Sequence, residues 1–262
     1  MLFNDCFLLV LSDKRGNMRA KKINVRVLVG AMCVAPLTGC GDTCNSNADI
    51  EKVTASLLEQ QCSAESDNVV ETLNVDEDGF RIVDMGLSVK WSSCNLGACK
   101  PEQSGNYYAW GELNKKAIYT ANNSATYSYS LSELRSMKVI DSKNVLLPSK
   151  DVASIKLGKN WRMPTREEAD ELIRKCKWEW GLKNGVKGYK VTGPNGGFIF
   201  LPANGYFFGS QIYDTDETGN YWTSTGYDNG NFSYALDFSK SRPKIASSGR
   251  SGGRCIRPVY VK

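Results

Sequence analysis

The sequence predicts an α+β fold with few helices, short strands and long loops over residues 79–262. Three observations support this prediction. The clearest local signal of this region, around residues 166–176, combines helical spacing of apolar residues with a helix start signal. A strong two-residue hairpin signal, Asn184-Gly185, follows it. The other apolar segments are short and lie between loops rich in glycine, serine and asparagine, which is typical of an α+β domain.

The first 39 residues have the order of features of a secretory signal. A basic stretch at residues 19–26 precedes an apolar run at residues 27–36, and small residues then lead to Cys40. The apolar run of about ten residues is too short to span a bilayer. A cysteine directly after small residues resembles the bacterial lipoprotein signal, in which that cysteine is acylated. We therefore expect a signal peptide over residues 1–39 and lipid attachment at Cys40.

Two alternatives stay open at this end of the chain. One is a plain signal peptide with an incidental cysteine. The other concerns the start, because residues 1–17 add a second apolar patch and further charges ahead of the basic stretch. Translation from Met18 would give a more regular signal. The mass of the mature N-terminus tests both, since a lipoprotein begins with a modified Cys40.

The charge of the chain is concentrated in the signal region. The whole chain carries 33 Lys and Arg and 28 Asp and Glu, a formal net charge of +5. Residues 1–39 hold six of the basic and two of the acidic residues, which leaves 27 and 26 in the remaining 223 residues. A net charge of about +1 does not favour a nucleic-acid partner. A chain of this length can bury one good core.

The absence of histidine excludes several kinds of site. The sequence contains no histidine at all. This removes Ser-His and Cys-His nucleophile pairs, histidine-containing zinc sites and the usual general base near neutral pH. We expect neither a cofactor nor a metal.

The cysteines leave the disulfide pattern open. Two of the nine lie in the signal region and Cys40 is the expected lipid site. An even number outside the cytoplasm permits disulfides, but six cysteines allow 15 pairings, and buried free thiols stay open too. No pair has CxxC spacing, which argues against a zinc ribbon. The six remaining are Cys44, Cys62, Cys94, Cys99, Cys176 and Cys255.

Residues 40–78 are predicted to form an acidic tether with a short helix. Apolar residues between Asp49 and Cys62 recur at helical spacing, and Asp49 can cap that helix. Ten acidic and two basic residues lie between Asp49 and Asp84. We interpret this segment as a solvated stalk that holds the following domain away from a membrane.

Two acidic segments begin like calcium loops, at residues 74–85 and 214–225. The twelfth position of such a loop requires a bidentate carboxylate, but it is Met85 in the first and Thr225 in the second. We interpret both as acidic turns containing glycine.

The globular region begins with short expected strands at Phe80–Ile82 and Leu87–Trp91, followed by mostly loop over residues 113–150. Thr165 and Glu168 form a capping box, which predicts a helix over Arg166–Cys176.

Strands and turns follow that helix. Residues 178–180 alternate like a strand, Asn184-Gly185 predicts a hairpin turn, and residues 185–191 return. A second turn is expected at residues 193–196 and another strand at residues 198–201.

Short segments spread over residues 79–262 resemble the Fibrobacter succinogenes major paralogous domain, which is common in lipoproteins of gut Bacteroidetes. Each segment is weak alone, and their order and spacing together are specific. The chain departs from the family at Cys255, where the family is serine-like. The segments are Val83–Trp91, Cys94–Ala98, Tyr108–Glu112, Trp161–Thr165, Tyr221–Thr225 and Gly253–Val259.

The resemblance implies a C-type-lectin-like fold of the kind shared with formylglycine-generating enzymes. Domains of this fold are compact and rich in loops, and they present a variable surface from their C-terminal part. The resemblance supplies neither a ligand nor catalytic residues, and a fold alone does not define a function.

The residue types of the C-terminal third favour binding of a glycan or protein ligand. Aromatic side chains pack against sugar or peptide surfaces, and Asn and Asp add directional hydrogen bonds, as in adaptable binding loops. We expect Trp222 and Phe238 to be core residues instead. The candidate ligand-binding residues are Tyr213, Tyr227, Asp228, Asn229, Asn231 and Tyr234.

Other functions stay open. A variable protein of a diversity-generating retroelement would vary residues 221–259, and a structural subunit of a surface fibre or outer-membrane complex would exchange strands. An enzyme of the formylglycine-generating type would need a positioned pair of reactive cysteines with a metal, and only the flanking Arg254 and Arg257 mark Cys255 as a low-pKa thiolate. A glycosidase would need two facing carboxylates, for which Glu112 and Asp237 could be nominated. Our leading prediction is a binding protein rather than an enzyme.

The C-terminal tail is basic after Asp237, and it could contact anionic glycans or lipid head groups. We favour a solvated face that balances the acidic stalk, with Arg162 and Arg257 as structural residues. The expected location is the outer membrane, with the domain facing the cell exterior, and a periplasmic orientation stays open.

Overall fold

The computed structural model describes the backbone of residues 6–12, 18–24 and 81–261, with side chains for residues 81–261. The chain divides into two compact units, Met1–Leu58 and Glu59–Lys262. In the first unit, β1 (Cys6–Ser12) pairs antiparallel with β2 (Met18–Asn24). No helix within the described ranges is long and apolar enough to cross a membrane. The predictions for the apolar run, for Cys40 and for residues 41–80 lie outside the described residues.

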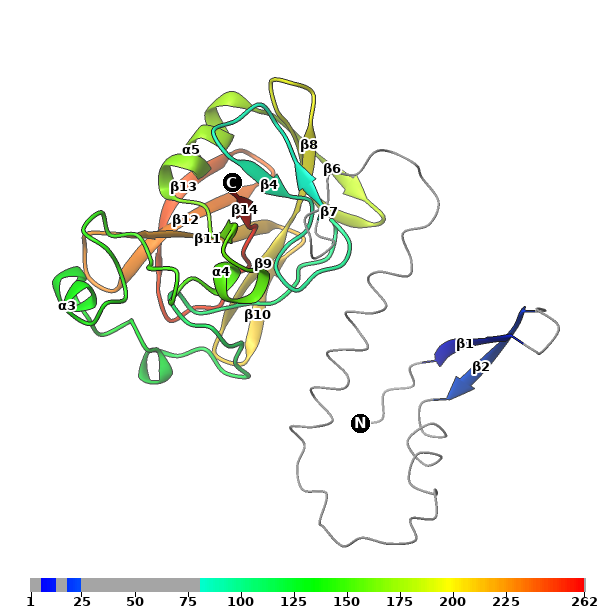
Figure 1. Cartoon of the computed structure of the whole chain (residues 1–262), viewed down its shortest axis with the longest axis horizontal. Helices are drawn as coiled ribbons and strands as arrows, with labels where there is room; N and C mark the ends of the chain where they lie inside the picture. Colours follow the sequence, from blue (N-terminus) through cyan, green and yellow to red (C-terminus); the bar gives the residue numbers. More distant parts are fainter. Residues whose placement is uncertain (1–5, 13–17, 25–80, 262) are drawn as a thin grey trace, which may run out of the picture. The chain divides into compact units, whose positions relative to one another are not determined.

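The second unit is mostly β-sheet, with three short α-helices among its described residues (Figure 1), which confirms an α+β fold of few helices. A five-stranded sheet forms its centre. In spatial order its strands are β10 (Gln211–Thr215), β9 (Asn204–Phe208), β11 (Thr218–Gly226), β12 (Phe232–Ser239) and β13 (Pro243–Gly249).

A smaller sheet joins distant parts of the chain. β14 (Val259–Tyr260) lies between β4 (Lys90–Ser92) and β5 (Trp161–Arg162), and β3 (Ile82–Val83) flanks β4. Three of the family-like segments therefore meet in one four-stranded sheet. The predicted strand at Leu87–Trp91 begins three residues late, because Gly86 has a positive φ of 69° and the chain bends before Lys90.

The third sheet contains the predicted hairpin. β6 (Lys177–Lys183) pairs with β7 (Val186–Thr192), and β8 (Phe198–Pro202) pairs with β7 on its other edge. The turn residues Asn184 and Gly185 have φ values of 50° and 83°, as the two-residue hairpin turn requires. The structure confirms this turn and the following strand.

Both faces of the central sheet are buried along most of β11 and β12. Trp222 and Ala235 point into one hydrophobic cluster, while Tyr221 and Leu236 point into another. This alternation follows from the period of two along a strand. Helix α5 (Arg166–Lys175) packs against β11, β12 and β13 and contributes Leu172 to the second cluster (Figure 1).

Each of the three described helices begins at a capping residue, but the sequence analysis used only one of these start signals. The capping box before α5 is present, with Thr165 Oγ1 accepting from the Glu168 backbone and a Glu168 carboxylate oxygen accepting from Thr165 N at 2.8 Å. The mostly-loop prediction for residues 113–150 was wrong at α3 (Leu131–Ser136), which has the same kind of box between Ser130 and Glu133. Helix α4 (Val152–Leu157) was not predicted either, and Asp151 caps it.

Candidate ligand-binding surface

The structure separates the six predicted binding residues into two groups. Tyr213 lies on the edge strand β10, is 40% exposed and stacks on Tyr206 of β9, with ring centroids 5.8 Å apart. The other five belong to the connection between β11 and β12 or to the first residues of β12. We call residues 227–231 the β11–β12 turn.

The β11–β12 turn presents polar side chains next to tyrosines. Asp228 and Asn229 are exposed, and Gly230 has a φ of 60° that favours glycine. The rings of Tyr227 and Tyr234 meet edge to face with centroids 5.0 Å apart. The Arg166 guanidinium lies 4.7 Å from the centre of the Tyr234 ring. Asn231 is half-buried, and its main-chain oxygen accepts a hydrogen bond from the chain that follows β13.

A buried arginine fixes the base of the turn. Arg250 is fully buried, and its backbone N–H donates to Asn231 O at 3.0 Å. Its guanidinium donates to the carbonyls of Phe232 at 2.9 Å, of Gly230 at 3.3 Å and of Tyr129 at 2.7 Å. Burial lowers the pKa of Arg250 to about 10, so it stays charged at neutral pH. One cation thus ties the C-terminal end of the turn to the loop that precedes α3.

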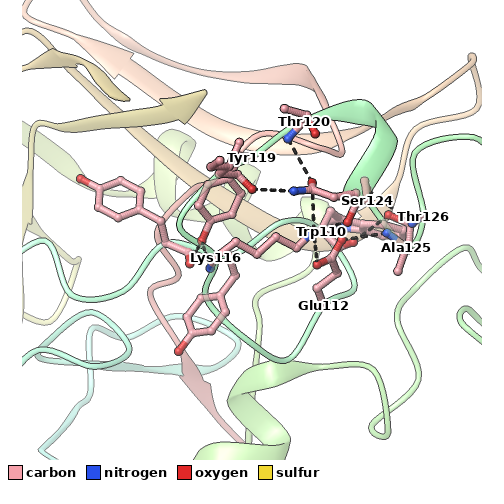
Figure 2. A network of polar contacts seen from close by, with 12 residues as sticks. Trp110, Glu112, Lys116, Tyr119, Thr120, Ser124, Ala125 and Thr126 are labelled. Atoms are coloured by element: carbon pink, nitrogen blue, oxygen red, sulfur yellow. Dashed lines mark hydrogen bonds and ion pairs between the residues drawn. The ribbon is translucent and has the colours of Figure 1, made fainter. Parts of the chain in front are cut away.

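That preceding loop has its own polar network (Figure 2). Glu112 forms an ion pair with Lys116 at 2.6 Å and accepts a hydrogen bond from Ala125 N at 2.8 Å. The Thr126 hydroxyl donates to Trp110 O at 2.8 Å, while the Thr126 carbonyl accepts from Arg250 at 3.2 Å. Glu112 therefore stabilises a loop in this structure, whereas Asp237, the other carboxylate nominated for a glycosidase, lies on β12.

The C-terminal tail exposes fewer cations than its sequence indicated. Arg250, Arg254 and Arg257 are all buried, so the exposed cations after Asp237 are Lys240, Arg242 and Lys244 among the described residues. The tail is a weaker candidate for anionic partners than its residue count suggested.

The structural roles predicted for two arginines are confirmed. Arg257 donates to Asn95 Oδ1 at 2.8 Å and to Phe200 O at 2.7 Å in the core. Arg162 forms a bidentate pair with Glu168 at the start of α5. The core positions predicted for Trp222 and Phe238 are confirmed as well, since both are buried.

The cysteines now have distinct states. Cys99 is disulfide-bonded, whereas Cys94, Cys176 and Cys255 are free thiols. Burial raises the pKa of the Cys255 thiol far above its ordinary value. Cys255 therefore lacks the low-pKa thiolate that chemistry of the formylglycine-generating type would need.

The acidic segment at residues 214–225 begins as a turn. Asp214 and Asp216 have φ values of 56° and 65°, and Glu217 N donates to Asp214 O at 3.1 Å. No group of three potential ligands among His, Cys, Asp and Glu is placed to hold a metal within the described residues. The first acidic segment lies mostly outside those residues.

Comparison of the chain with protein families, with curated proteins and with solved structures gives no match. The likeness to the paralogous domain family therefore stays a prediction that depends on the six segments.

Two residues of this surface were missed at the sequence level. Arg250 was counted as part of a basic tail, and Arg166 only as a helix residue. Their partners lie far away in the chain, so no local pattern marks them.

Proposed function

We propose that this chain is a lipid-anchored binding protein of the outer membrane, with a C-type-lectin-like domain of the paralogous family. The domain recognises a glycan or protein ligand outside the cell, and the β11–β12 turn is its contact surface. The lipid on Cys40 would hold the protein at the membrane, and the acidic stalk would separate the domain from it.

One observation carries this proposal. The β11–β12 turn combines exposed Asp228 and Asn229 with a base held by Arg250. A loop already held in one conformation loses less conformational entropy on binding, so more of the contact energy appears as affinity. Tyr227 and Tyr234 add aromatic surface beside these polar groups, and tyrosine and asparagine are common in adaptable binding surfaces.

A glycan array probed with the full chain, purified in detergent, tests the proposal. We expect binding that is lost in the double variant Tyr227→Ala/Asn229→Ala. The matched control is Phe198→Ala/Asn122→Ala, which removes an exposed aromatic ring and an exposed amide elsewhere on the domain. Unchanged binding in the first variant would exclude the turn as the contact surface.

The anchor has a separate test. Mass spectrometry of the mature protein is expected to show a lipid-modified Cys40 as the first residue. An unmodified N-terminus at another position would exclude the anchor and leave the binding proposal intact.

A further inference from the structure

One row of side chains crosses all five strands of the central sheet. In the antiparallel pairs, Tyr213 lies opposite Tyr206, Asn220 opposite Asp237, and Asp237 opposite Lys244. β9 and β11 are parallel, and the pairing of Gly205 with Gly219 places the residues that follow them, Tyr206 and Asn220, side by side. Residues opposite one another on paired strands point to the same face. In spatial order the row is Tyr213, Tyr206, Asn220, Asp237 and Lys244.

Arg254 lies over this row. Its backbone pairs with Tyr108 in an antiparallel bridge, with both N···O distances 3.0 Å. Its guanidinium carbon lies 4.5 Å from the centre of the Trp222 ring and 5.7 Å from that of Tyr206. Only 8% of the residue is exposed. The cation therefore lies over two aromatic rings, which attract it without using its N–H groups.

The polar atoms at the centre of the row lack partners. Nε and Nη1 of Arg254 and Oδ1 of Asp237 are buried and make no hydrogen bond with any described residue. The two side chains interact electrostatically but form no ion pair within 4 Å in this part of the chain. Close by, Asn204 Oδ1 accepts from Asn220 N at 3.1 Å.

Buried polar atoms without partners are costly and rare in native proteins. Burial raises the pKa of Asp237, and Arg254 and Lys244 counteract that rise. Two opposite charges separated by more than direct contact can be joined by a group that both donates and accepts a hydrogen bond. A hydroxyl does both: it donates to the carboxylate and accepts from the guanidinium.

The charges also select among ligands. An anion at this position would be repelled by Asp237, and a cation would be repelled by Arg254. A neutral polyhydroxylated molecule meets neither repulsion. At the end of the row, the stacked Tyr206 and Tyr213 offer aromatic surface, with Tyr213 open to solvent.

We infer that the row binds a neutral pyranose sugar, whose hydroxyls bridge Arg254 and Asp237 and whose ring packs against Tyr206 and Tyr213. This inference rests on the proposed function only in treating the chain as a binding protein. The site is built from the sheet face, not from the β11–β12 turn.

Titration of the full chain in detergent with methyl glycosides of glucose, galactose and mannose tests the inference, with affinity measured by NMR. We expect at least one glycoside to bind. Tyr213→Ala and Asp237→Asn should each weaken that binding about tenfold or more, since hydrogen bonds to charged groups and aromatic packing are worth that much. Tyr213 is exposed, so its variant is not expected to disturb folding.

The matched control is Ile212→Ala. Ile212 is the neighbour of Tyr213 on β10, pairs with Phe207 and points to the opposite face of the hairpin, where it is also exposed. Its variant should bind the glycoside with wild-type affinity. Equal losses in Ile212→Ala and Tyr213→Ala would overturn the inference, because the effect would then come from the hairpin as a whole.

Further outcomes separate this site from the turn. Wild-type glycoside affinity in Tyr227→Ala/Asn229→Ala would support an independent site, even if array binding by the turn fails. Tighter binding of methyl glucuronide than of methyl glucoside would overturn the neutral ligand. No binding of any glycoside, together with an ordered water alone between Arg254 and Asp237 in a crystal structure, would overturn the site.

Discussion

Arg250 and Arg254 lie four residues apart, both are buried, and their environments are opposite. Arg250 donates to carbonyl groups of two loops, and it leaves no nitrogen unpartnered among the described residues. The Arg254 guanidinium makes no hydrogen bond there and lies over the rings of Tyr206 and Trp222. The comparison shows that burial alone does not define an arginine's role. A guanidinium whose nitrogens all donate to the protein holds the fold together. One whose nitrogens have no acceptor can still donate to a ligand.

The largest expected effect on stability comes from replacing Arg250, whose guanidinium nitrogens all have acceptors. Arg250→Met would leave buried carbonyls of Phe232, Tyr129 and Thr126 without donors. We expect a loss of about 3–5 kcal/mol in the free energy of unfolding, the typical cost of removing one partner from a buried charged network. Urea denaturation followed by tryptophan fluorescence measures it. A loss below about 1 kcal/mol would contradict the structural role.

The carboxylate beside Arg254 should make stability depend on pH. Burial raises the pKa of Asp237, so the folded state holds its proton to higher pH than the unfolded state does. Stability is therefore expected to fall as pH rises from about 4 through the raised pKa, by about 1.4 kcal/mol for each unit of pKa shift.

Asp237→Asn isolates this contribution. Other groups, such as Asp151, also have raised pKa values, so the quantity to compare is the difference between wild type and variant across pH. The fall should be shallower in the variant. Parallel curves would show that the carboxylate is better solvated than the structure indicates.

The smallest expected effect on stability comes from replacing Arg254 and Asp237 together. Replacing a buried charge pair by side chains of similar volume is often neutral or stabilising. We expect Arg254→Met/Asp237→Asn to lose less than about 1 kcal/mol in thermal or urea unfolding, while the pyranose site is abolished. A loss as large as that of Arg250→Met would mean that both arginines are structural and would remove the contrast.

Local signals account for the parts of the fold that the sequence predicted. The capping box at Thr165 and Glu168 and the Asn184-Gly185 turn depend on neighbouring residues only, and both were predicted correctly. Helix α3 carries an equally local box at Ser130 and Glu133. It was missed because the surrounding stretch is polar and rich in Ser, Asn and Tyr, which favoured a loop.

The candidate sites depended on partners that no local pattern reveals. Arg250 binds carbonyls more than 100 residues earlier in the chain, and the row on the central sheet exists only through strand register. The sequence singled out Tyr213 by residue type and assigned it to the same surface as the β11–β12 turn. Its stacking on Tyr206 and the isolation of Arg254 required the tertiary structure.

The position of β14 has a consequence for the order of folding. This strand lies in the middle of its sheet, hydrogen-bonded on one side to β4 and on the other to β5. The four-stranded sheet therefore cannot close until residues 259–260 have been synthesised, although β3 begins at residue 82. Such non-local pairing slows folding. Until β14 is made, β4 and β5 have no strand between them, so this sheet stays open while the segments that flank it are synthesised.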